Sequence, residues 1–118
     1  MKILVTGACG VTSRAIVRSI RCSERFGGAE IVGTDVADNP FGLFEGLYRR
    51  VYRSPHVGDP AYADWMHQCC ERERPDAAIV IPELELCFWS ERGAFPAPAL
   101  LPPPKFSRIA ISKARLYE

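Results

Sequence analysis

A strong excess of charge is absent from this sequence of 118 residues, and so is any long apolar run. Its 15 Lys and Arg residues nearly balance 14 Asp and Glu residues, which leaves a net charge of +1. No global field therefore favours nucleic acid or an anionic membrane as a partner. No apolar stretch approaches the ~20 residues that span a bilayer, and the first residues lack the profile of a signal peptide. We therefore expect a cytoplasmic protein with neither nucleic acid nor membrane among its partners.

Paired cysteines are absent as well. The five cysteines are odd in number and form no C-x-x-C motif: Cys9, Cys22, Cys69, Cys70 and Cys87. This pattern excludes a disulfide framework and a zinc motif of ordinary spacing. Only Cys9 stands at an expected helix start, where a thiol ionises more readily. A nucleophilic role would need a histidine base, and the sequence places neither His56 nor His67 beside it, so the reactivity of Cys9 stays open.

The chain opens on a βα unit, in the stretch MKILVTGACGVTSRA. Residues 2–6 form an apolar, β-branched run that predicts a buried strand. A glycine turn at residues 7–10 follows, and Thr12 or Ser13 is placed to cap a helix over residues 13–25. Gly7 and Gly10 permit a close approach of a ligand to the backbone, and the amides at the helix start favour an anion.

This turn departs from two known fingerprints. A dinucleotide-binding G-x-G-x-x-G would place glycines where Cys9 and Thr12 stand. The short-chain dehydrogenase variant T-G-x-x-G-x-x-G matches Thr6, Gly7 and Gly10 but not Ser13. The sequence therefore leaves three alternatives open: a turn without a ligand, a site for an anionic substrate, and a dinucleotide site.

The rest of the chain alternates strands with helices. The expected strands cover residues 30–35, 49–53, 77–81 and 96–101, and the expected helices cover residues 60–74, 84–92 and part of 105–118. The strand at 49–53 carries the charges of an edge strand, whereas the run AAIVI at 77–81 is apolar enough to be central. The pattern predicts an α/β, Rossmann-like open parallel sheet of about five strands in the order 3-2-1-4-5, flanked by helices.

Three acidic residues follow expected strands and are therefore candidate site residues. Ligands of open α/β sheets bind at the carboxyl ends of the strands. Asp35 ends the second strand, where a dinucleotide-binding domain holds a ribose, or where it simply caps a turn. Glu83 and Glu85 follow the fourth strand, so they are placed for substrate or metal contacts, or else only for the favourable field of a helix start.

Taken in order, these segments resemble the N-terminal (pre-ATP-grasp) domain of ATP-grasp ligases, such as carbamoyl-phosphate synthase large chain and biotin carboxylase. The similarity covers the motifs ILVTGACG, GTDVADNP, RRVYRSP, DPAYADWM, AAIVIPELE and PPKFSRIAISKARLYE. The last motif has Ser112-Lys113 where many members have Asp-Lys. The resemblance implies a domain at residues 1–104 and, at 105–118, a hinge into an ATP-binding region that the sequence does not contain.

The resemblance also implies a function. The full-length protein would activate a carboxylate with ATP and Mg²⁺ for attack by an amine, while this fragment alone would bind neither cofactor and would not be catalytic. Gly7, Ala8, Cys9 and Gly10 would face the acceptor, with Glu83 and Glu85 across from them. Together with the helix start, these residues suit an amino-acid-like or small phosphorylated acceptor. The apolar stripe of the tail makes a homodimer one expected arrangement.

Two other functions stay open. One is an NAD(P)-binding domain of the short-chain dehydrogenase type, in which Asp35 would bind the cofactor. That class uses a Tyr-x-x-x-Lys pair, and no such pair occurs in the sequence. The other is a non-catalytic α/β binding module.

Overall fold

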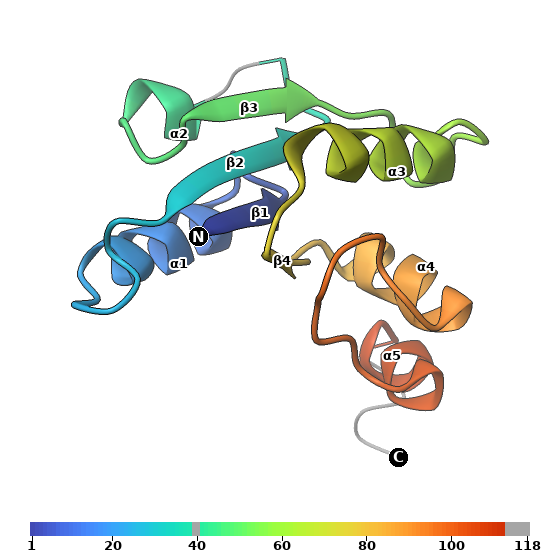
Figure 1. Cartoon of the computed structure of the whole chain (residues 1–118). Coiled ribbons are helices and arrows are strands. Elements are labelled where there is room, and N and C mark those ends of the chain that lie inside the picture. The colour runs from blue at the N-terminus through green and yellow to red at the C-terminus, as the bar shows by residue number, and fades with distance from the viewer. Residues whose placement is uncertain (39–40, 113–118) are drawn as a thin grey trace.

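The computed structural model describes residues 1–38 and 41–112. The elements are β1 (Lys2–Thr6), α1 (Val11–Arg21), β2 (Glu30–Asp35), α2 (Phe41–Phe44), β3 (Arg50–Arg53), α3 (Tyr62–Glu73), β4 (Ala77–Ile79), α4 (Glu83–Arg92) and α5 (Pro104–Ala110). The strands form one open, all-parallel sheet of four strands in the order β3-β2-β1-β4 (Figure 1). The α/β class and the order of the first four strands are therefore confirmed.

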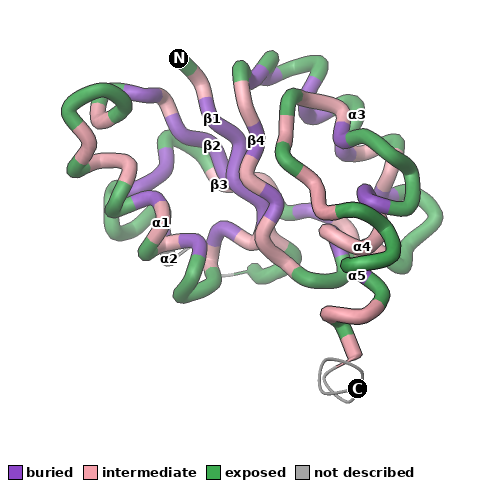
Figure 2. Tube along the Cα trace, turned by 90° about the horizontal axis from the view of Figure 1, so that it is seen from below, coloured by how far each residue is buried: buried purple, intermediate pink, exposed green. Residues whose placement is uncertain are grey.

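Helices cover both faces of the sheet. Figure 2 shows the buried strands in the middle, with α1 and α2 on one side and α3, α4 and α5 on the other. Side chains alternate along a strand, so β1 contributes to both cores. Leu4 packs in the core beneath α3 and α4, with Met66 and Trp89, whereas Ile3 and Val5 pack in the core beneath α1.

The first helix begins and ends earlier than the sequence predicted. Its N-cap is Gly10, with no side-chain cap, so neither Thr12 nor Ser13 caps it. Ser13 is instead buried, and its Oγ lies 3.4 Å from the carbonyl oxygen of Thr6. The helix stops at Arg21, because Ser23 then bonds to Phe26 and Gly27 in a turn.

The helix α3 also starts later than predicted. Asp59 caps a turn rather than the helix, since its Oδ1 accepts the amide of Ala61 at 2.9 Å and its carbonyl accepts that of Tyr62 at 3.0 Å. The N-cap of the helix is Ala61. The turn brings Tyr62, fully buried, against Trp89 of α4.

The predicted fifth strand is not formed in the part of the chain that the structure describes. Segment 96–101 makes a single parallel bridge, Ala78 with Ala99, and the carbonyl of Pro98 accepts the amide of Ala78 at 2.8 Å. Pro96 and Pro98 carry no amide hydrogen, so this segment cannot continue a ladder. The strand β4 is shorter than predicted because the amide of Ile81 donates to the Thr6 side chain instead of to a strand.

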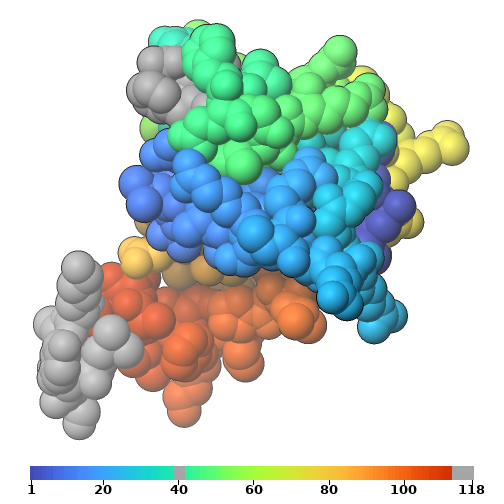
Figure 3. Space-filling view, turned by 90° about the vertical axis from the view of Figure 1, so that its left-hand side faces the viewer, coloured from blue at the N-terminus to red at the C-terminus, as the bar shows by residue number. Residues whose placement is uncertain are grey.

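The C-terminal helix packs back onto α4. The hydroxyl of Ser107 lies 3.2 Å from that of Ser90, and both residues are buried. In Figure 3 the segment with α5 forms a ridge below α1, and the surface between them is hollowed. Residues 113–118 of the predicted hinge lie outside the described residues. Within 1–38 and 41–112, every helix is too short or too polar to cross a membrane.

Candidate functional site

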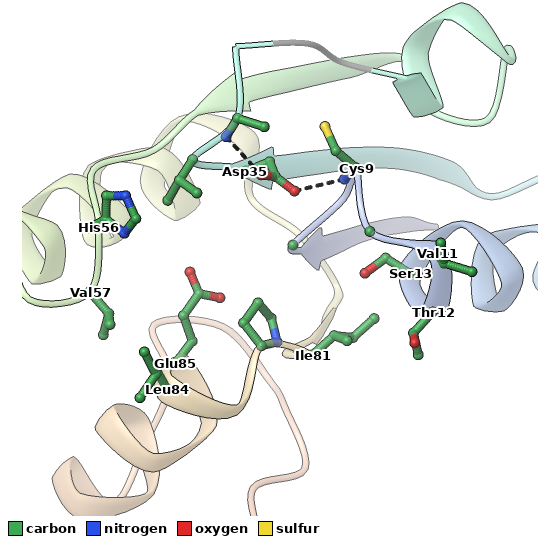
Figure 4. Close-up of a pocket in the computed structure, with 15 residues that line it drawn as sticks. Cys9, Val11, Thr12, Ser13, Asp35, His56, Val57, Ile81, Leu84 and Glu85 are labelled. Carbon is green, nitrogen blue, oxygen red and sulfur yellow. Dashed lines mark hydrogen bonds between the residues drawn. The ribbon is translucent and has the colours of Figure 1, made fainter. Parts of the chain in front are cut away.

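A cleft of about 630 Å³ opens at the carboxyl ends of β1, β2 and β4. Its lining comes from the glycine turn and the start of α1, the end of β2, the loop after β3, and the start of α4 (Figure 4): Gly7, Cys9, Gly10, Val11, Thr12, Ser13, Asp35, Val36, Ala37, His56, Val57, Ile81, Pro82, Leu84 and Glu85. Parallel α/β sheets bind ligands at this edge. The structure thus brings the glycine turn, Asp35 and Glu85 together, as their positions after strands predicted.

Gly7 sets how closely two walls of the cleft approach. Its φ of +62° is in the left-handed region, which glycine adopts without strain. A Cβ on Gly7 would lie 2.7 Å from Pro82 Cγ. The loop before α4 can therefore pack on the turn only because residue 7 has no side chain.

Three amides of the turn are bonded within the protein. Ala8 donates to the carbonyl of Thr34 at 3.0 Å, Cys9 to Asp35 Oδ2 at 2.8 Å, and Gly10 to the carbonyl of Gly7 at 3.0 Å. The resemblance implied that this turn faces the acceptor substrate. That contact stays a prediction, and these three amides do not support it, because each already has an acceptor within the protein.

The start of α1 offers the amides that remain. The first intrahelical bond runs from Arg14 to the carbonyl of Gly10 at 3.1 Å. The amides of Val11, Thr12 and Ser13 precede it and have no partner inside the helix. They carry the positive end of the helix dipole and border the cleft. The sequence predicted that the helix, and with it the free amides, would begin at residue 13, whereas the N-cap Gly10 places these amides at residues 11–13.

Asp35 lines the cleft but supports the turn. Its Oδ2 accepts the amide of Cys9 at 2.8 Å, and its Oδ1 accepts the amide of Ala37 at 2.9 Å (Figure 4). Its carboxylate thereby holds the ends of β1 and β2 together. A contact between Asp35 and a ribose stays an untested alternative.

Glu85 is the most unusual group in the cleft. Its side chain is 7% exposed, and Oε2 has no hydrogen-bond partner. In Figure 4 its carboxyl group points into the cleft, toward the side where His56 and Asp35 lie. Burial raises the pKa of the Glu85 carboxyl, hydrogen bonds with Thr6 and Tyr62 oppose the rise, and the charge of Asp35 adds to it. An unpaired buried carboxyl oxygen is costly, which points to a ligand as its partner.

Two hydroxyl groups orient this carboxyl. Thr6 Oγ1 accepts the amide of Ile81 at 3.1 Å, and the Tyr62 hydroxyl accepts Trp89 Nε1 at 3.1 Å. Each hydroxyl thus has its own proton left to donate to Glu85. Burial raises the pKa of Tyr62, so its proton stays in place. Sequence reasoning missed both residues, because one ends an apolar strand and the other belongs to a helical core stripe.

The two glutamates after β4 are separated. Successive residues of a helix are ~100° apart, so residues two apart face nearly opposite directions. Glu85 is buried at the cleft, whereas Glu83 is exposed and borders the groove between α4 and α5. The structure therefore brings only Glu85 opposite the glycine turn.

Of the cysteine and histidine candidates, Cys9 and His56 lie in the same cleft, whereas His67 does not. Cys9 and His56 both border the cleft, but the Cys9 sulfur points away from the Glu85 carboxyl (Figure 4). His67 lies elsewhere, edge-on to Trp89 with 5.9 Å between ring centroids. This arrangement adds no support for a nucleophilic Cys9.

A metal centre is not evident in residues 1–38 and 41–112, which bring together no group of three or more His, Cys, Asp or Glu side chains suited to an ion. Neither a family model nor a curated protein matches this chain significantly. The function must therefore be inferred from the cleft itself.

Proposed function

We propose that the chain is the substrate-side domain of an ATP-dependent carboxylate–amine ligase of the ATP-grasp type, and that the cleft binds the acceptor substrate. The observation that carries the proposal is the pairing of two walls across one cleft: the amides at the start of α1 and the unpaired carboxyl oxygen of Glu85. The first wall suits a carboxylate or phosphate, and the second suits an amine or hydroxyl. An amino-acid-like or small phosphorylated acceptor has both ends.

The parallel sheet and the motifs quoted above support the same assignment, although a fold of this kind serves many functions. The described residues provide no cluster for Mg²⁺, so we assign no phosphoryl-transfer step to them. Their part in the reaction is to bind and orient the acceptor. A carboxyl group at the amine end can also accept a proton as the amine becomes a nucleophile.

Calorimetry on the purified chain tests the proposal. Amino acids and small phosphorylated amines should bind weakly, and ATP should not bind tightly. Val11→Glu should lower the affinity for an anionic acceptor about tenfold, because it places a negative charge beside the α1 amides (~1.4 kcal/mol). Val11 is 76% exposed, so the fold should tolerate the change.

Ser19→Glu is the matched control, since Ser19 is exposed on the same helix and does not line the cleft. It should leave the affinity unchanged. Micromolar binding of ATP to the chain would refute the proposal. Tight binding of NAD(H), weakened by Asp35→Asn, would favour the dehydrogenase alternative instead.

A further inference from the structure

Three buried side-chain oxygens at the carboxyl edge of the sheet lack a hydrogen-bond partner. They are Thr34 Oγ1, Ser54 Oγ and Glu85 Oε2, on residues that are 0%, 5% and 7% exposed. Buried polar atoms are nearly always paired, so each exception asks for an explanation such as a bound water or ion. These three oxygens lie on one face of the sheet, and we infer a common cause for them.

The strand register places the two unpaired hydroxyls on neighbouring stretches of chain, diagonally across from one another. Thr34 of β2 lies opposite Thr6 of β1 and opposite Tyr52 of β3. Ser54 follows Tyr52 by two residues and continues the ladder, since its amide donates to the carbonyl of Asp35 at 2.8 Å. Residues two apart on a strand face the same side. The side chains of Thr6, Thr34 and Ser54 therefore project to the same face of the sheet.

This face is the one that α3 and α4 cover. Leu4 and Val32, two residues before Thr6 and Thr34, pack in the core with residues of α3 and α4. Glu85 reaches the same place from α4, where it bonds with Thr6 and with Tyr62 of α3. The unpaired oxygens of Thr34, Ser54 and Glu85 thus lie on the face of the sheet that α3 and α4 cover, beside the cleft that Glu85 lines.

The charge of Glu85 is uncompensated. Within the described ranges, no Lys, Arg or His forms an ion pair with Glu85, and the charge of Asp35, which raises the pKa of Glu85, is also negative. Hydroxyl and carboxyl oxygens are hard ligands that prefer a cation or N–H donors. A single carboxylate is a poor site for Ca²⁺, which takes six to eight oxygens, but it balances one positive charge.

We propose that Thr34, Ser54 and Glu85 form an ammonium pocket, which holds an ammonium group through three of its N–H donors. The group belongs either to a free ammonium ion or to the amine end of a ligand that enters from the cleft. The pocket rests on the cleft of the proposed function but not on ligase activity. It assigns a specificity role to Thr34 and Ser54, because a secondary or tertiary ammonium has fewer than three N–H donors and more bulk.

Thermal unfolding of the purified chain in four chloride salts at one concentration tests the pocket. Ammonium should raise the melting temperature above its value in potassium or tetramethylammonium chloride, which match its charge but offer no N–H. Methylammonium distinguishes the sources. A shift as large as that of ammonium indicates the amine end of a ligand, and a shift with ammonium alone indicates the free ion. Equal melting temperatures in all four salts would overturn the proposal.

Substitutions of the two hydroxyl residues distinguish ammonium binding from a purely structural role of these side chains. Thr34→Val and Ser54→Ala remove an unpaired buried oxygen, so both should raise the melting temperature of the free protein and abolish the ammonium-specific shift. Ser90→Ala is the matched control, because the Ser90 hydroxyl is buried but paired with Ser107 at 3.2 Å. It should lower the melting temperature and keep the shift.

A shift that persists in both Thr34→Val and Ser54→Ala would show that these hydroxyls hold only water, and would overturn the pocket. Binding of an anionic acceptor to the cleft, measured by calorimetry as above, separates this failure from that of the proposed function. If the acceptor binds but the ammonium-specific shift is absent, the pocket is wrong and the proposed function is still supported. If the shift is present but no acceptor binds, the proposed function is wrong and the pocket is still supported.

Discussion

Pro82 packs so closely on Gly7 that a Cβ at residue 7 would lie 2.7 Å from Pro82 Cγ and 3.1 Å from its Cδ. The contact joins the turn after β1 to the loop after β4, and these segments are neighbours because their strands pair. Gly7 combines this contact with a φ of +62°. The cleft therefore needs glycine at residue 7 for two reasons, the left-handed backbone conformation and the lack of space for a Cβ beside Pro82.

Gly7→Ala should lower the free energy of unfolding by about 2–4 kcal/mol, because left-handed strain and overlap with Pro82 add together. Urea denaturation measures the change. Gly93→Ala separates the two causes, since Gly93 has a φ of +82° but open space around its Cα. That control should cost only about 1–2 kcal/mol. Equal losses in both variants would mean that the contact with Pro82 adds nothing.

Asp35→Ala should lower the free energy of unfolding by about 1–3 kcal/mol, because it leaves the amide of Cys9 without its acceptor. Asp38→Ala is a suitable comparison. Asp38 pairs with Arg53, but these side chains are 75% and 69% exposed, so the loss should stay within about 0.5 kcal/mol. Both values come from urea denaturation at neutral pH. A loss for Asp35→Ala no larger than that for Asp38→Ala would show that the turn holds its shape unaided.

The sheet was largely predictable from the sequence, because buried parallel strands appear as short apolar runs. Residues 3–5 and 31–32 are such runs, and they lie in the two inner strands. The fifth strand was wrong for a local reason that the sequence already showed, since Pro96 and Pro98 cannot donate to a ladder. The start of α1 was misplaced because Ser13, a good N-cap residue, turns inward to Thr6.

The candidate site was only half predictable. Asp35 and Glu85 follow strands, and the rule that ligands bind at strand carboxyl ends was enough to single them out. Thr34 and Ser54 gave no such signal, because a hydroxyl inside an apolar strand looks like any β-branched or small residue. Their importance depends on the register across β1, β2 and β3, which no local pattern encodes.

Glu85→Gln should make the chain more stable by an amount that grows with pH. Burial raises the pKa of Glu85 above its ordinary value of 4.5, so the folded state binds its proton more tightly than the unfolded state. The contribution of Glu85 to stability is therefore complete below pH 4.5 and is lost as pH rises through the raised pKa. Urea denaturation from about pH 4 to about pH 8 should show the difference between the variant and wild type widening.

Glu91→Gln gives the opposite sign as a control. A hydrogen bond with Arg108 lowers the pKa of Glu91, so its contribution is present at high pH and is lost as pH falls. Glu91→Gln should therefore become less stable than wild type as pH rises. The difference should be small because the pair is exposed. A pH-independent difference for Glu85→Gln would mean that the Glu85 carboxyl has its ordinary pKa.

Tyr62→Phe should lower stability, and more at high pH than at low pH. The Tyr62 hydroxyl accepts Trp89 Nε1 at 3.1 Å and hydrogen-bonds with Glu85. Its removal leaves a buried indole N–H unpaired at every pH, which costs about 1–3 kcal/mol. It also removes a bond that lowers the pKa of Glu85, so ionisation of that carboxyl becomes more costly as pH rises.

A double-mutant cycle isolates the second effect. In a Glu85→Gln background no carboxyl titrates at this position, so the loss caused by Tyr62→Phe should be the same at about pH 4 and about pH 8. Tyr48→Phe is the matched control, because the Tyr48 hydroxyl is buried without a partner. It should be neutral or stabilising over the same range, since it removes an unpaired oxygen. If Tyr62→Phe alone costs the same at both pH values, its hydroxyl does not act on Glu85, and the orientation of the cleft carboxyl must come from Thr6.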